Sequence, residues 1–80
     1  MMRKVIYKYG PFVTGEQMNF PGRPVHFGMQ QGQIFVWAEN DLDVHQTQQY
    51  YTIVGTGHEY VGKHLFTLFD GPFVWHLIWQ

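Results

Sequence analysis

No cysteine and no serine occur among the 80 residues of the chain, and charged residues make up only 14% of it. Without cysteine the chain can form neither a disulfide framework nor a thiolate metal site. Without serine it lacks a common hydroxyl nucleophile, and its threonines are of the kind that pack in strands. We therefore predict that the protein is not an enzyme, has no catalytic residue and needs no cofactor.

The positive charges are few and scattered. Five Lys and Arg residues are interspersed with six acidic residues, and the formal net charge is −1. No basic stripe is present to neutralise a run of phosphates, which argues against binding to duplex nucleic acid but leaves room for one small anion. The chain also lacks a signal-peptide pattern and any stretch of about 20 apolar residues. These absences predict a cytoplasmic protein without a membrane partner.

Helix signals are nearly absent, because glycine and proline interrupt the chain at short intervals and β-branched and aromatic residues dominate between them. The pattern predicts a single all-β domain over residues 1–80, a small antiparallel meander of about six or seven strands, sheet-like or barrel-like. The expected strands span residues 3–9, 17–20, 25–30, 33–39, 46–54, 63–69 and 73–79. We expect Gly10-Pro11 to end the first strand, and hairpin turns at Gln31-Gly32 and Asp70-Gly71.

Residues 73–79 form a strand-like run that is apolar or aromatic on both of its alternating faces. Residues 34–38 share this property, which predicts a central strand or an interface strand. A domain of this size buries only about 60–65% of the surface of its unfolded chain, so it has little material to cover both faces. We therefore expect a homo-oligomer, which would also stabilise the small core.

Several short motifs occur together in one order. They are Ile6-Tyr7-Lys8-Tyr9, Gly32 followed by Val36-Trp37-Ala38, Tyr51-Thr52-Ile53-Val54-Gly55-Thr56-Gly57-His58, and Tyr60-Val61-Gly62. Over residues 3–68 this pattern resembles a family of small uncharacterised phage and prophage proteins, a domain of unknown function. The resemblance implies a viral origin and a small β fold, and it implies no activity. The chain departs from the pattern after His58, where relatives carry a proline and a longer loop, so a loop-borne site need not be shared.

The segment Gly55-Thr56-Gly57-His58 has two interpretations. The glycines would allow backbone N–H groups to approach a phosphate, with the threonine hydroxyl and the imidazole as further contacts. Alternatively, the same residues form a β-bulge or a tight turn that needs glycine for its backbone angles. Dinucleotide-binding and P-loop motifs are excluded, because both need a helix that the sequence does not predict.

The five histidines show no His-x-x-x-His spacing, and the acidic residues nearest to them fall in predicted loops. We therefore predict no metal site.

The aromatic residues, 19% of the chain, are more numerous than a one-sided core requires. Most are expected in the core or an interface, but Trp37, Tyr60 and Trp75 are also candidates for stacking on a nucleobase. Arg23 and Lys63 are the candidates for neutralising its phosphate.

These residues suggest a phage-encoded homo-oligomer that binds and sequesters a nucleotide-derived immune signal in the cytoplasm of an infected bacterium. Cyclic ADP-ribose derivatives and cyclic oligonucleotides are the signals considered, and the expected effect is to counteract anti-phage defence. One alternative is an inhibitor or adaptor that binds a host protein. Others are a small virion component and a phosphodiesterase-like enzyme with His58 as its acid or base.

Overall fold

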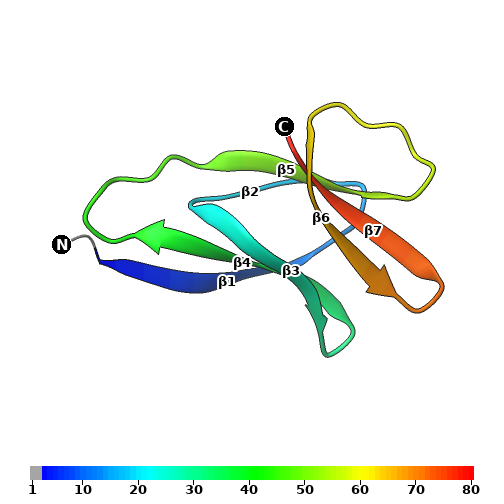
Figure 1. The fold of residues 1–80 in the computed structure, drawn as a ribbon, viewed down its shortest axis with the longest axis horizontal. Helices are drawn as coiled ribbons and strands as arrows, with labels where there is room; N and C mark the ends of the chain where they lie inside the picture. The colour runs from blue at the N-terminus through cyan, green and yellow to red at the C-terminus, as the bar shows by residue number, and fades with distance from the viewer. Residues whose placement is uncertain (1–2) are drawn as a thin grey trace.

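The computed structural model describes residues 3–80, which form seven strands and no helix (Figure 1). The strands are β1 (Lys4–Phe12), β2 (Gln17–Phe20), β3 (Arg23–Gln30), β4 (Gln33–Asp41), β5 (Gln49–Gly55), β6 (Lys63–Asp70) and β7 (Phe73–Trp79). They form two antiparallel sheets, with the strand orders β1-β4-β3 and β2-β5-β7-β6. The predicted all-β class is confirmed. The order differs from a plain meander, because only the β3–β4 and β6–β7 hairpins pair strands that follow each other directly.

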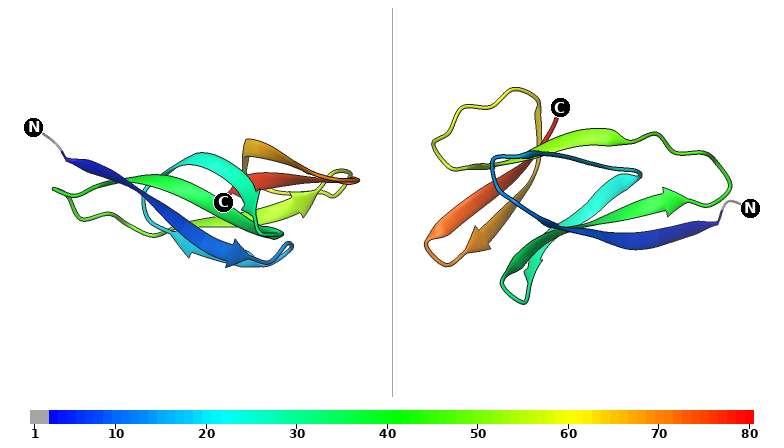
Figure 2. Two further views of the ribbon diagram at one scale, coloured as in Figure 1. Left: turned by 90° about the horizontal axis from the view of Figure 1, so that it is seen from below. Right: turned by 180° about the vertical axis from the view of Figure 1, so that it is seen from behind.

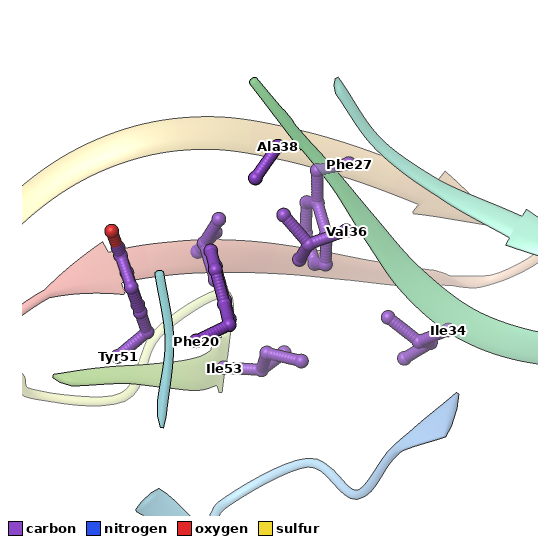
Figure 3. Close-up of a cluster of buried hydrophobic side chains, with 8 residues drawn as sticks. Phe20, Phe27, Ile34, Val36, Ala38, Tyr51 and Ile53 are labelled. Carbon is purple, nitrogen blue, oxygen red and sulfur yellow. The ribbon is translucent and has the colours of Figure 1, made fainter. Parts of the chain in front are cut away.

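The core lies between the two sheets. Its buried side chains come from β3 and β4 of the first sheet and from β2, β5 and β7 of the second; they are Phe20, Phe27, Ile34, Val36, Ala38, Tyr51, Ile53 and Leu77 (Figure 3). Phe20 and Tyr51 stack with ring centroids 4.3 Å apart and with nearly parallel planes. β4 is the central strand of its sheet, one of the two alternatives predicted for residues 34–38, and alternate residues of β4 point into this core.

Asn40 is a buried polar residue at the end of β4. Its side-chain nitrogen donates hydrogen bonds to the Tyr9 hydroxyl and to the Ala38 carbonyl, at 3.1 and 3.2 Å. Because both amide hydrogens have acceptors, the buried amide avoids part of the desolvation cost of an unpaired polar group. The bond to Tyr9 also connects β1 to β4 beside the aromatic core.

The strand pairing corrects several predicted boundaries. β3 begins at Arg23 instead of residue 25, since Arg23 pairs with Glu39 of β4. β1 continues through Gly10-Pro11 to Phe12, because a register shift accommodates the proline and Phe12 then pairs with Ile34. β5 begins at Gln49 instead of residue 46, since Gln49 pairs with the last residue of β2. β4 extends two residues further, to Asp41, along β1. The second hairpin turns at residues 71–72, because Asp70 is still paired with Phe73.

The two-sided C-terminal run is covered differently from the prediction. Leu77 and Ile78 are both fully buried although they point to opposite faces of β7. Leu77 joins the core, whereas Ile78 lies against Gly62, at the end of the segment that leaves β5 and returns to β6 (yellow in Figure 1). One chain therefore covers both faces of β7 at Leu77 and Ile78, whereas Phe73 and Trp79 stay partly exposed, and the homo-oligomer expected from this run stays a prediction.

Candidate functional site

A cleft of about 450 Å³ opens where β3 of one sheet lies beside β6 of the other. Arg23 is the first residue of β3 and Lys63 the first residue of β6, so the topology brings both predicted cations to the same cleft. Its walls are mainly apolar and aromatic, and include Tyr51, Leu65, Phe66 and Trp79. A concave, mostly apolar site of this size with a few polar groups is typical of small-molecule binding.

The two cations differ in how far their charges are neutralised. Arg23 Nη2 lies 3.5 Å from Glu39 Oε1, and its side chain is 72% exposed. Glu39 also interacts with Lys4, at 3.4 Å, and the hydrogen bond from Lys4 is the main cause that holds the pKa of Glu39 below its ordinary value. Lys63 forms no ion pair with any residue of the described range 3–80. The cleft therefore presents one free ammonium group and one weakly paired guanidinium group.

Tyr51 and Trp79 form the aromatic part of the cleft. Burial raises the pKa of the Tyr51 hydroxyl above its ordinary value. The Trp79 indole N–H donates a hydrogen bond to Gln49 Oε1 at 3.2 Å, which positions a partly exposed ring at the cleft. Sequence reasoning did not select Trp79 as a site residue, although the residue belongs to the two-sided C-terminal run. The available signal was its place in that run, in which both alternating faces are apolar or aromatic.

A polar pocket adjoins the aromatic cleft and shares Gly22, Arg23 and Gln49 with it. Its volume is about 460 Å³. Asp41 and Gln46 line this pocket, and Asp41 Oδ1 and Gln46 Oε1 are buried oxygens without a hydrogen-bond donor in the described part of the chain. Buried acceptors are normally paired. These two oxygens can accept hydrogen bonds from hydroxyl or amino groups, a property that the sequence did not indicate.

The Gly55–His58 turn lies at another place, in a smaller cavity of about 220 Å³ that Tyr60 also lines. Here the Thr56 N–H donates to the Val74 carbonyl and the His58 N–H to the Gly55 carbonyl, both at 3.2 Å. Two backbone donors that a phosphate cradle would use are therefore engaged within the protein. This geometry favours the tight-turn interpretation of the segment over the cradle.

The remaining two candidates, Trp37 and Trp75, do not line the Arg23–Lys63 cleft. Trp37 packs beside His26 and Phe35, with ring centroids 5.2 and 6.1 Å away. Trp75 stacks with Phe73 and lines a hollow that also includes the Gly55–His58 turn. The nine predicted site residues therefore divide among separate surfaces of one chain, and only the two cations share the aromatic cleft.

Within residues 3–80, no three histidine, cysteine or acidic side chains gather closely enough to hold a metal ion. The same residues contain no helix with the length and apolarity needed to cross a membrane.

No curated protein and no solved structure matches the chain. A family model does match, and it extends beyond the motif resemblance to include residues 69–80. It is described as Domain of unknown function (DUF7352) and matches residues 2–80, so the chain belongs to this uncharacterised family.

Proposed function

We propose that the protein binds a small anionic ligand derived from a nucleotide in the cleft between β3 and β6. The observation that carries this proposal is the convergence of Arg23 and Lys63 on one aromatic-lined cleft. A guanidinium group and an ammonium group form charge-assisted hydrogen bonds with phosphate oxygens. Aromatic side chains stack on nucleobases of any sequence, because every base has a π-face.

In the proposed complex, phosphate lies between Arg23 and Lys63, and the base contacts the Trp79 ring. The unpaired oxygens of Asp41 and Gln46 in the adjoining pocket accept hydrogen bonds from the ribose hydroxyls or from an amino group. The proposed ligand is larger than inorganic phosphate, since it occupies both the aromatic cleft and the polar pocket next to it.

At the biological level we propose sequestration of a nucleotide-derived immune signal, either a cyclic ADP-ribose derivative or a cyclic oligonucleotide. The proposed protein is phage-encoded, acts in the cytoplasm of an infected bacterium and counteracts anti-phage defence. The support for this context is the motif resemblance to small phage and prophage proteins. Sequestration requires only stoichiometric binding, so this role needs no catalytic group.

Isothermal titration with a panel of these signals, and with AMP and inorganic phosphate, tests the proposal. We expect saturable binding of at least one signal, weaker binding of phosphate, and an affinity that falls as salt concentration rises. Arg23→Gln and Lys63→Gln should each weaken binding about tenfold or more, as expected for the loss of a charge-assisted contact. Lys8→Gln is the matched control, because Lys8 contacts Gln30 and the Phe35 ring and does not line the cleft. Absence of heat with every member of the panel would refute the proposal.

One observation supports a second function, the binding of a host protein. Phe69 and Phe73 flank the β6–β7 turn and are 76% and 57% exposed. Exposed aromatic residues are characteristic of protein–protein contacts. This alternative predicts a one-to-one complex with a host protein that Phe69→Ser and Phe73→Ser disrupt and that Arg23→Gln leaves intact.

A further inference from the structure

Two histidines and two threonines gather on the face of the second sheet that points away from the core. His64 and Thr67 lie on β6, His76 lies on β7, and Thr56 follows β5. Thr67 and His76 are directly paired across the two strands, and the register shift between His64 and Phe66 keeps His64 beside them. Residues paired across antiparallel strands place their side chains on the same face, so strand pairing itself brings these side chains together.

Three donor atoms of this cluster converge. His64 Nε2 lies 2.9 Å from Thr67 Oγ1, His76 Nδ1 lies 3.1 Å from Thr67 Oγ1, and the two ring nitrogens are 3.3 Å apart. Two ligands of a tetrahedral metal ion with bonds of about 2.0–2.1 Å are also about 3.3 Å apart. The two imidazole nitrogens therefore already have the separation that a shared ion requires.

A hydrogen-bond chain connects His76 to Thr56 and to the Val74 carbonyl. Thr56 Oγ1 lies 3.5 Å from the Val74 carbonyl, which can only accept, and 2.8 Å from His76 Nε2. In the arrangement that satisfies both contacts, the hydroxyl donates to the carbonyl and its oxygen accepts the N–H of His76 Nε2. This tautomer leaves a lone pair on His76 Nδ1, directed into the cluster. Histidine ligands of metals are usually held through their second nitrogen in this way.

We propose that His64 Nε2 and His76 Nδ1 bind a divalent zinc, nickel or copper ion. Imidazole nitrogen is a preferred ligand for these ions. The Thr67 hydroxyl oxygen lies beside both ring nitrogens and is the proposed third ligand. The proposed site therefore contains two histidines and one neutral hydroxyl. The adjoining cavity of about 220 Å³ has room for water or a small ligand at the remaining coordination positions. This site shares no residue with the Arg23–Lys63 cleft, so it does not depend on the proposed nucleotide function.

Titration of the tag-free protein with zinc tests the site. Calorimetry measures the binding, and NMR signals of the histidine rings show which residues bind the ion. We expect one ion per chain and shifts confined to the His64 and His76 rings. His64→Asn and His76→Asn should each weaken zinc binding at least about tenfold. The control is His45→Asn, because His45 lies outside the cluster, in the segment between β4 and β5.

The Thr56→Val variant provides a second test that removes no metal ligand. It retains the shape of the side chain but loses the acceptor for His76 Nε2, so zinc affinity should fall about 10- to 100-fold. Circular dichroism and the unfolding midpoint of the metal-free protein verify that each variant is folded. Absence of saturable zinc binding would overturn the proposal, as would equal affinity in the folded His64→Asn and His76→Asn variants.

Discussion

Gly62 shows how a single residue determines whether the segment before β6 can return to the second sheet. Its φ of +127° is a backbone conformation that other residues rarely adopt, and a Cβ at this position would overlap the Trp79 carbonyl oxygen and approach the Ile78 side chain at 2.9 Å. Gly57 also has a positive φ, +92°, but a Cβ there would have no neighbour within 4 Å. Substitution of Gly57 therefore tests the effect of the backbone angle on stability alone, whereas substitution of Gly62 tests that effect together with close packing.

We predict that Gly62→Ala destabilises the protein much more than Gly57→Ala. The backbone conformation alone costs about 1–3 kcal/mol in either variant. Overlap with backbone atoms of β7 adds to this, so we expect a loss of about 3 kcal/mol or more for Gly62→Ala. Urea denaturation monitored by tryptophan fluorescence measures both values. Equal losses would show that the contact with β7 has no energetic weight.

At the scale of elements, Arg3 and Asp43 join the start of β1 to the turn after β4. The Arg3 backbone N–H donates to Asp43 Oδ2 at 2.7 Å, and Arg3 Nη2 donates to Oδ1 at 2.8 Å. The hydrogen bonds from the Arg3 side chain, followed by the backbone bond, hold the pKa of Asp43 below its ordinary value of 3.8. The contact is exposed, so its contribution to stability is small.

The pH dependence of this contact has a definite sign. A carboxyl group whose pKa is lowered by folding stabilises the folded state above its ordinary pKa, and this contribution is lost as pH falls through the folded pKa. Arg3→Ala should raise the pKa of Asp43 toward 3.8 without reaching it, because the backbone hydrogen bond remains. An NMR titration of the side-chain carboxyl measures the change. Lys4→Ala is the control, since Lys4 pairs with Glu39 and should leave Asp43 unchanged.

Much of the fold was predictable at this scale, because strands and turns leave local signals. The bounds of β2 and β7 were predicted exactly, and both hairpins were located to within one residue. Pairing between distant strands was not predictable: nothing local to β5 indicates that Tyr51 pairs with Met18 on one side and Trp79 on the other. Such register depends on side-chain packing across the whole sheet.

The same limit explains the outcome for the candidate site. Arg23 and Lys63 were chosen for their charge, and their shared cleft follows from the contact between β3 and β6, which no motif encodes. The alternation of side chains along a strand places Trp37 on one face of β4. It does not indicate which face of the strand another element will cover. The proximity of His64 and His76 was not predictable from their spacing along the chain, because it results from cross-strand register and a bulge.

At the scale of the whole molecule, the domain is long and thin. Its principal extents are 43 × 28 × 16 Å, and Figure 2 shows the flat profile from the side. The radius of gyration of 13.0 Å exceeds the value of about 11.6 Å expected for a compact chain of this length. An elongated shape leaves more surface in water for each buried residue, which increases the advantage of assembly.

We predict that the protein forms a homo-oligomer through the exposed aromatic residues of the β6–β7 hairpin. Trp75→Asp is an ambiguous test, because Trp75 packs against the core of its own chain and the charge would also destabilise the monomer. Phe73→Asp is sharper, since Phe73 is 57% exposed; Ile6→Asp is its control, with the same exposure on β1 of the other sheet. Native mass spectrometry and light scattering should give discrete oligomers for the unmodified protein and for Ile6→Asp, and monomers for Phe73→Asp. A monomeric unmodified protein at micromolar concentration would contradict the prediction, whereas dissociation in both variants would place the interface on more than the hairpin.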